Sequence, residues 1–203
     1  ASDNPELVEK SMTALKHDLN FDAHLKGAGV VVHLGSHQGR GFEAVKHDLV
    51  ERMAEILKTT PANSTFIIEN SAGQNGKIAS DLTEITWLID QLKSERVKWC
   101  FDTCHGFAAG KKLSGFDSVI TEMEQLGLLN NLACLHVNDT RDSFASGRDR
   151  HANIGEGEIG AEVLKEFLTD PRISHIPMIT EVPGLDGNGP DQENVTRLWE
   201  LVK

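Results

Sequence analysis

The sequence predicts an α/β protein built on a parallel β-sheet that is buried on both faces. Short apolar runs alternate with longer segments whose apolar residues recur every three or four positions, and this alternation is typical of repeated strand–helix units. Parallel strands that are buried on both faces form continuous apolar runs of this kind. The 203 residues contain no linker and no low-complexity tract, so we expect residues 1–203 to form a single domain.

Six helices are expected, each with one apolar face. The first has Pro5 in its opening turn, where Ser2 or Asp3 can cap it, and its apolar face runs from Val8 to Leu19. The remaining five are expected around residues 42–56, 78–92, 116–126, 159–168 and 195–202.

Five strands are expected between these helices, because each connecting segment contains a short apolar run followed by glycine or polar residues. They cover residues 30–34, 66–69, 97–102, 132–139 and 177–182. The strand that ends at Asp102 is followed by a turn that Asp102 can cap. The longest stretch without periodicity, residues 140–157, is expected to be a polar loop.

Charge and cysteine content limit the classes of function. The net charge of −11 argues against broad, non-specific binding to nucleic acid, although it leaves room for a local basic patch. Three cysteines give no disulfide framework, and a metal site formed by Cys100 and Cys104 lacks the second cysteine pair that would complete it. We therefore expect reduced thiols and a cytoplasmic protein.

No apolar run is long enough to span a bilayer, and the polar opening from Ala1 to Pro5 does not read as a signal peptide. We expect no membrane partner. Nine histidines are many for this length, and several of them follow apolar runs, which is a first indication of a metal site.

Every expected strand ends in a residue that can bind a metal. In chain order these residues are His33, Glu69, Asp102, His136 and Glu181. They are separated by 36, 33, 34 and 45 residues, close to the length of one strand–helix unit. The carboxyl ends of parallel strands open on one face, where active sites lie, so these side chains are expected to converge.

Two further groups extend this constellation. His105 lies one turn beyond Asp102, and Asp149 and His151 form an i, i+2 pair in the long polar loop. Mixed histidine and carboxylate ligands without thiolates suit catalytic Zn²⁺ or Mn²⁺. Eight ligands are too many for one ion and indicate a cluster, and clustered metals are typical of phosphoester hydrolysis.

The sequence resembles the endonuclease IV family of apurinic/apyrimidinic (AP) endonucleases. The resemblance lies in six segments that follow the family order and cover nearly the whole chain. They are VHLGSH (32–37), IENSAGQ (68–74), FDTCHGFAAG (101–110), LHVND (135–139), RDRHANIGEG (148–157) and TEVPG (180–184).

This resemblance implies a fold, a substrate and a reaction. The fold would be a TIM-barrel-like, xylose-isomerase-like α/β domain, here a partial barrel of about five parallel strands with surrounding helices. The substrate would be double-stranded DNA with abasic sites, and the phosphodiester 5′ to the abasic sugar would be hydrolysed by metal-activated water to leave a 3′-hydroxyl, as in base excision repair.

The resemblance also implies up to three Zn²⁺ ions, with Mn²⁺ possible at one site. Glu69 would be the catalytic, bridging carboxylate. The implied ligand sets are His33 with Glu69 for the first ion, Glu69 with Asp102, His136 and Glu181 for the second, and His105 with Asp149 and His151 for the third. Apart from the resemblance, Arg148 and Arg150 belong to a local basic cluster in the long polar loop, which is rich in Ser and Gly, and we expect them to contact DNA phosphates, although such a loop can also be merely solvated.

The chain corresponds to the last five of the eight βα units that a complete barrel needs. The family's third strand, which normally supplies one more histidine to the first ion, has no counterpart here, so we expect that ion to be held most weakly. Two sheet edges would remain unpaired, which predicts self-association or an edge covered by the N-terminal helix.

Two alternatives remain open. A sugar isomerase or epimerase of the related xylose-isomerase-like barrels would use only Glu69, Asp102, His136 and Glu181 around a single ion. A non-cutting, shortened relative would bind metal and damaged DNA without hydrolysis. The number of bound metals distinguishes the sugar isomerase or epimerase from the AP endonuclease. An incision assay distinguishes the non-cutting relative from the AP endonuclease.

Overall fold

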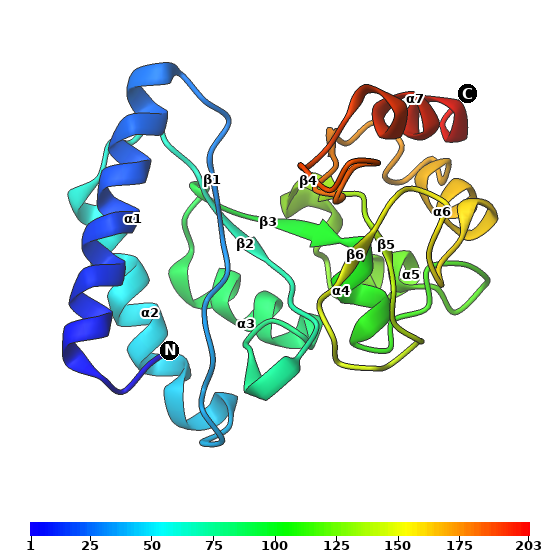
Figure 1. The fold of residues 1–203 in the computed structure, drawn as a ribbon. Helices are drawn as coiled ribbons and strands as arrows, with labels where there is room; N and C mark the ends of the chain where they lie inside the picture. The colour runs from blue at the N-terminus through cyan, green and yellow to red at the C-terminus, as the bar shows by residue number, and fades with distance from the viewer.

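The computed structural model describes residues 1–203 and is organised around a five-stranded parallel sheet (Figure 1). The strands are β1 (Val30–Val32), β2 (Phe66–Glu69), β3 (Val97–Asp102), β4 (Leu132–His136) and β7 (Met178–Ile179). Their order is β1-β2-β3-β4-β7, and every neighbouring pair is parallel. The sheet is a partial barrel with β1 and β7 at its edges, which confirms the predicted fold class.

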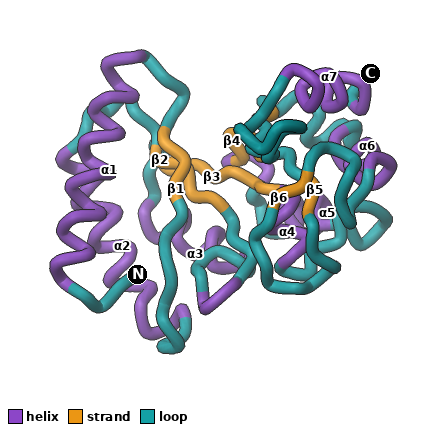
Figure 2. Tube along the Cα trace, in the orientation of Figure 1, coloured by secondary structure: helices purple, strands orange, loops and turns teal.

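Seven α-helices surround the sheet (Figure 2). They are α1 (Pro5–Leu25), α2 (Phe42–Thr59), α3 (Leu82–Leu92), α4 (Thr103–Ala108), α5 (Val119–Gln125), α6 (Ala161–Leu168) and α7 (Gln192–Leu201). Two 3₁₀ turns, η1 (Gln74–Gly76) and η2 (Leu129–Asn131), precede α3 and β4. Figure 1 shows α1 beside α2 on the side of β1, and α6 near α7 on the opposite side of the molecule. No helix combines the length and the apolar character needed to cross a membrane.

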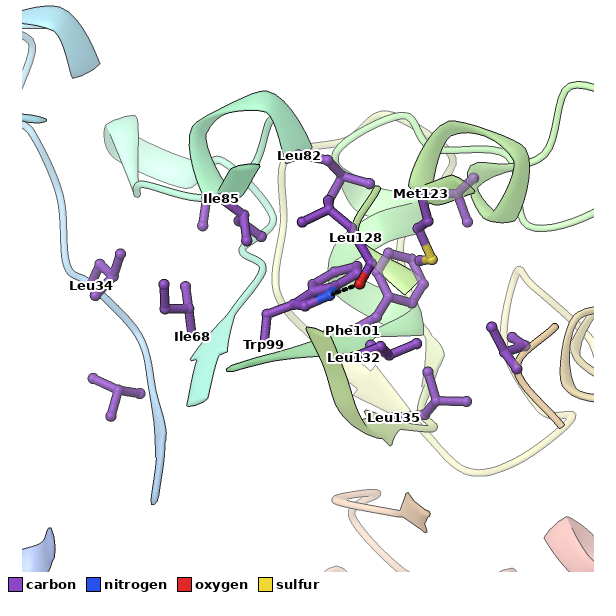
Figure 3. Packing of buried hydrophobic residues seen from close by; sticks show 14 of the residues in the cluster. Leu34, Ile68, Leu82, Ile85, Trp99, Phe101, Met123, Leu128, Leu132 and Leu135 are labelled. Carbon is purple, nitrogen blue, oxygen red and sulfur yellow. Dashed lines mark hydrogen bonds between the residues drawn. The ribbon is translucent and has the colours of Figure 1, made fainter. Parts of the chain in front are cut away.

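The two faces of the sheet are unequal. The face that packs against the helices contributes to a hydrophobic core of 33 buried residues, including Trp99 and Phe101 from β3 (Figure 3). The indole of Trp99 donates a hydrogen bond to the carbonyl of Leu128 at 2.9 Å, so even its polar atom is satisfied in the core. On the other face, only Ile67, Cys100 and Cys134 form a small separate cluster.

Strand alternation explains why the site lies on the second face. Side chains two positions apart in a strand point to the same side, so Ile67 shares its face with Glu69, and Cys100 shares its face with Asp102. A register shift between Trp99 and Cys100 sets Cys100 opposite Cys134 and Asp102 opposite His136. The irregularity therefore aligns the ends of β3 and β4, as β-bulges near functional sites often do.

The α2 helix begins at Phe42 as predicted, whereas the caps or first residues of several other helices differ from the sequence prediction. Asn4, rather than Ser2 or Asp3, caps α1, because its side chain accepts from the amides of Glu6 and Leu7. The α3 and α5 helices start at Leu82 and Val119, later than apolar periodicity indicated. Phe116 accordingly precedes α5 and is 98% exposed.

Two short elements were not predicted. The turn after β3 is the helix α4, and the Asp102 side chain accepts from the His105 amide at 2.8 Å to cap it. The expected polar loop contains the antiparallel pair β5 (Asp139–Thr140) and β6 (His151–Ala152). The strand predicted to end at Asp139 therefore ends at His136, and Asp139 begins a new element.

The N-terminal helix lies near one edge of the sheet. It contacts both α2 and β1, and a cavity of about 250 Å³ separates these three elements. The cavity lining is mostly apolar and includes Met12 of α1, Val32 of β1 and Met53 of α2.

Candidate metal centre

The ends of the parallel strands bring the five predicted strand-end residues to one place. Glu69, Asp102 and His136 are the last residues of β2, β3 and β4. His33 directly follows β1, and Glu181 follows β7 by two residues. Strand pairing fixes these positions, because β2, β3 and β4 are held by hydrogen bonds between neighbouring strands.

Glu69 lies at the centre of the constellation and is 5% exposed. Its Oε1 is 3.0 Å from His136 Nδ1 and 3.4 Å from His105 Nδ1. Its Oε2 is 3.4 Å from His33 Nε2. The two carboxylate oxygens therefore face different histidines, which is the arrangement that a carboxylate shared between two ions requires.

The loop-borne pair reaches the same cluster from the opposite side. Asp149 Oδ1 is 3.0 Å from His105 Nε2 and 3.5 Å from His151 Nε2. His151 Nε2 is also 3.8 Å from Asp102 Oδ2. Pairing of Thr140 with His151 in β5 and β6 anchors this segment, and Figure 1 shows the pair next to α4, which carries His105.

All eight predicted ligand positions thus belong to one cluster of overlapping groups. Within each group, the potential ligand atoms lie within 4.8 Å of one another. The groups are Glu69 with Asp102, His136 and Glu181; His33 with Glu69 and His105; Asp102 with His105 and His151; and Asp149 with His151 and Cys104. The first group coincides with the set predicted for the second ion, whereas His105 lies between the sets predicted for the other two ions.

The electrostatics of the cluster favour bound cations. Burial alone would lower the pKa of His105, but Asp102, Asp149 and Glu69 outweigh it and raise that pKa to about 11. Burial likewise opposes the effect of Glu181 and Glu69 on His136, whose pKa is raised to about 10. The carboxylates therefore stabilise positive charge strongly.

The ionisation of Glu69 and the state of two buried imidazole nitrogens also favour bound cations. Burial raises the pKa of Glu69, but hydrogen bonds with His105 and His136 lower it to about 2, so Glu69 is ionised. The Nε2 atoms of His105 and His151 are buried, and their contacts with Asp149 Oδ1 at 3.0 and 3.5 Å lack hydrogen-bond geometry. Unsatisfied buried nitrogens beside ionised carboxylates fit divalent metal ions of the Zn²⁺ and Mn²⁺ class.

Two asparagines orient the strand-end ligands. Asn138 donates from Nδ2 to Asp102 Oδ2 at 2.6 Å, and its Oδ1 accepts from the Glu181 amide at 2.8 Å. Asn70 bonds the backbone of Asp102 in both directions, accepting at 2.6 Å and donating at 3.1 Å. Sequence analysis assigned no role to Asn138, although an amide just beyond an apolar strand end is a signal for one.

Asp139 organises the loop-borne part of the site and was also missed. Its buried carboxylate accepts from four backbone amides, those of Thr140, Gly157, Ile159 and Gly160, at 2.8–3.2 Å. A Cβ at Gly157 would lie 2.3 Å from the Thr140 carbonyl oxygen, so only glycine fits there. Asp139 thereby closes the segment that carries Asp149 and His151.

The two predicted DNA-binding arginines lie at the exposed rim. The Arg148 and Arg150 side chains are 64% and 55% exposed, and both pair with Asp142. Arg150 Nε donates to Asp142 Oδ2 at 2.6 Å, and Arg148 Nη1 is 3.5 Å from Asp142 Oδ1. Lys77, which sequence analysis did not single out, lies 3.3 Å from Asp149 Oδ2.

Comparison with known proteins places this geometry in a family context. The sequence profile of the xylose isomerase-like TIM barrel family matches residues 1–199. A probable endonuclease 4 of Methanoculleus marisnigri is 34% identical over 207 residues, which cover 100% of this chain and 73% of the relative. A probable endonuclease 4 of Persephonella marina is 35% identical, with 100% and 72% covered.

Solved structures give the same result. The crystal structure of endonuclease IV from Thermus thermophilus superimposes with a TM-score of 0.84 at 30% identity, covering 98% of this chain and 70% of that one. A D-tagatose 3-epimerase-like protein superimposes with a TM-score of 0.73 over 99% of this chain and 72% of its own, but at 18% identity. That second likeness concerns the fold alone.

Proposed function

The chain belongs to the endonuclease IV family of xylose isomerase-like TIM barrels, and we propose that it is a metal-dependent AP endonuclease of DNA repair. The proposed reaction is hydrolysis of the phosphodiester 5′ to an abasic site in double-stranded DNA, with a 3′-hydroxyl as one product. The observation that carries this proposal is the central position of Glu69, whose two oxygens face His33 on one side and His105 and His136 on the other.

The ligand sets follow from this arrangement. We assign His33 and Glu69 to a first ion, and the group of Glu69, Asp102, His136 and Glu181 to a second. His105, Asp149 and His151 are assigned to a third. Zn²⁺ is the proposed ion at up to three positions, with Mn²⁺ possible at one. Bound cations of this kind supply Lewis acidity toward phosphate oxygens and lower the pKa of water.

The protein's own residues hold and align the reacting groups. Asn138, which follows β4, fixes the Asp102 carboxylate at the end of β3 relative to the Glu181 backbone beyond β7, so ligands from the two strands that flank β4 keep one geometry. Arg148 and Arg150 are proposed to contact DNA backbone phosphates. These contacts would replace the ion pairs that both arginines form with Asp142. No side chain is required as general base in this scheme.

Recognition of the abasic site and self-association are further parts of the proposal. An abasic nucleotide lacks a base, so its sugar-phosphate can approach a site recessed at the strand ends more closely than an intact nucleotide can. The strands β1 and β7 each pair on one side only, which leaves backbone groups available to a second chain. Sedimentation of the purified protein tests the second point.

Incision of a defined duplex tests the proposed activity. A duplex with a single synthetic abasic site is incubated with the protein and Zn²⁺ or Mn²⁺, and an intact duplex of the same sequence serves as control. We expect a single cut 5′ to the abasic site, a product that a polymerase can extend from its 3′-hydroxyl, and loss of cutting on chelation. Binding of the abasic duplex without cutting would favour the non-cutting relative instead.

Metal content separates the nuclease from a sugar isomerase or epimerase. A single-ion enzyme needs only Glu69, Asp102, His136 and Glu181, whereas the nearby His105, Asp149 and His151 have no place in it. More than one ion per chain in elemental analysis supports the nuclease. A single ion that persists in the His105→Ala variant would support the alternative.

A further inference from the structure

A pair of cysteines lies directly beneath the ligand layer on the same face of the sheet. Cys100 on β3 and Cys134 on β4 are register partners, each two positions before a predicted ligand of its strand. Cys100 is 0% exposed and Cys134 is 6% exposed. The two sulfur atoms and a ring nitrogen of His136 all lie within 4.8 Å of one another.

We propose that Cys100, Cys134 and His136 form a binding site for a soft, thiophilic metal cation. Thiolate ligands select soft ions, whereas the carboxylates above them select harder ones, so the two layers differ in the cation they prefer. When a divalent ion binds, both thiols and the protonated ring of His136 release one proton each to solvent, as two sulfur–metal bonds and one nitrogen–metal bond form. The two thiolate charges then balance the charge of the ion, and no net charge is buried by these three groups.

The surroundings of the pair suit such a neutral centre. Its neighbours in the small cluster are Ile67, which is 4% exposed, and the partly buried Val31 and Ala133. None of these neighbours offers a side-chain hydrogen bond to compete with a metal. The register shift before Cys100 aligns both layers at once, since it sets Cys100 opposite Cys134 as well as Asp102 opposite His136.

The third cysteine belongs to a different environment. Cys104 lies in α4, and its sulfur groups with Asp149 and His151 rather than with the other thiols. A soft ion bound there would have one sulfur ligand, whereas the proposed site has two. This difference makes Cys104 the matched control, and it separates the proposal from a Cys100–Cys104 site.

Cadmium binding to the metal-free protein tests the site. Cd²⁺ is titrated under reducing conditions, and the ultraviolet sulfur-to-cadmium charge-transfer band is followed. The intensity of this band grows with the number of bound thiolates. We expect a tight phase with two thiolates in the wild type and in Cys104→Ala. The tight two-thiolate phase should disappear in Cys100→Ala and in Cys134→Ala. Alanine is preferred to serine because it leaves no unsatisfied buried hydroxyl.

A second measurement needs no variant. The ¹¹³Cd resonance of the wild-type protein loaded with one equivalent distinguishes two-sulfur from one-sulfur coordination by its chemical shift. A two-sulfur shift supports the proposal even if a cysteine variant fails to fold. A one-sulfur shift, or a charge-transfer band that depends on Cys104 alone, would overturn it.

The sharing of His136 gives a consequence that rests on the proposed nuclease function. His136 also lies 3.0 Å from both Glu69 and Glu181, so a soft ion that engages it competes with the second ion. With Mn²⁺ in excess, low Cd²⁺ should inhibit incision by the wild type at least about tenfold more strongly than incision by the Cys100→Ala/Cys134→Ala double variant. Equal inhibition would refute the coupling, whereas absence of any incision would count against the nuclease proposal alone.

Discussion

The strand-borne and loop-borne halves of the candidate metal centre are held in place by different means. Glu69, Asp102 and His136 end three adjacent strands, and the ladder hydrogen bonds of the sheet fix their spacing. Asp149 and His151 lie in a segment that is fixed by one two-residue strand pair and by the Asp139 carboxylate. The strand-borne half is therefore held by the hydrogen-bond ladder of the whole sheet, whereas the loop-borne half depends on a few specific hydrogen bonds.

This contrast predicts how each half responds to damage. Loss of a strand-borne ligand should remove chemistry without disturbing the fold, because the strand persists. Loss of a loop anchor should displace two ligands at once and leave the strand-borne set intact.

The largest effect is expected for the central carboxylate. Glu69→Gln keeps the size of the side chain but removes the charge that faces His33, His105 and His136. Incision should fall by about 10³-fold or more, because an electrostatic contribution to the transition state is lost at the centre of the site. Metal content should fall as well. Incision and elemental analysis are compared with those of Asp117→Ala, whose side chain pairs only with Lys112 at the surface.

Near-normal incision by Glu69→Gln would contradict the proposed mechanism. The circular dichroism of the variant should match the wild type, since β2 retains its pairing with β1 and β3. A variant that unfolds would instead show that the sheet depends on the ligand layer, and the distinction between the two halves would fail.

The loop anchor should come second. Asp139→Ala leaves four backbone amides without their acceptor, at a cost of about 1–3 kcal/mol for each buried group that stays unsatisfied. We expect roughly 10²-fold slower incision, loss of the metal that we assign to Asp149 and His151, and faster hydrogen exchange in residues 140–160. Glu158→Gln, in the same segment and with no side-chain hydrogen bond, is the control. Unchanged exchange in that segment would refute the anchoring role.

The orienting amide should have a smaller effect. Asn138→Ala removes the bond to Asp102 Oδ2 and the acceptor for the Glu181 amide. Outer-shell partners of metal ligands typically contribute 10- to 100-fold in metal affinity, so we expect a loss of about tenfold that excess metal restores. Metal titration of incision rates measures this. Persistence of the defect at saturating metal would show that Asn138 acts on the fold rather than on the ligands.

The strand-borne half was also the more predictable one from sequence. Each strand is a local apolar run, so Glu69, Asp102 and His136 are recognisable as strand-end residues without any knowledge of the fold. His33 and Glu181 lie one and two residues beyond the ends of β1 and β7. Parallel pairing then brings their carboxyl ends together as a general rule. Predicting the convergence needed only periodicity and the alternation of elements.

The loop-borne half depends on distant partners and left a weaker signal. The strands β5 and β6 have two residues each, too few for any alternation to be visible, and they pair across the segment between Thr140 and His151. Three of the four amides that bond Asp139 lie 18–21 residues further along the chain. The i, i+2 spacing and the family resemblance identify Asp149 and His151 as candidate ligands. Asp139 has no spacing or motif role that would identify it as the anchor of this segment.

Local competition explains the remaining differences. The α4 segment contains Gly106 and two weak helix formers, Thr103 and His105, so its sequence predicts a turn. Capping by Asp102 nevertheless stabilises it as a helix. Phe116 fits the apolar spacing of α5, yet the helix starts only at Val119 and leaves this ring in solvent. Periodicity alone does not locate the first residue of a helix.

The smallest effect is expected at the exposed arginines of the loop-borne half. Phosphate contacts by Arg148 and Arg150 would be electrostatic and independent of sequence, so each alanine variant should weaken DNA binding about threefold to tenfold and lower the slope of log affinity against log salt by about one. Binding to abasic duplexes of two sequences, measured over a range of salt concentrations, tests this. Arg150→Ala needs a metal analysis as well, since Arg150 lies between Asp149 and His151.

Substitution of Asp142 is expected to change DNA binding in the opposite direction. It pairs with both arginines in the protein alone, so it competes with any phosphate that they contact. Asp142→Ala should therefore strengthen DNA binding and steepen its salt dependence, opposite in sign to the arginine variants, and it should leave metal content unchanged because Asp142 belongs to no ligand group. Weaker DNA binding by Asp142→Ala would mean that the pairing positions the arginines for DNA rather than competing with it. Unchanged DNA binding by all three variants would mean that Arg148 and Arg150 are solvated surface residues without a role in DNA binding.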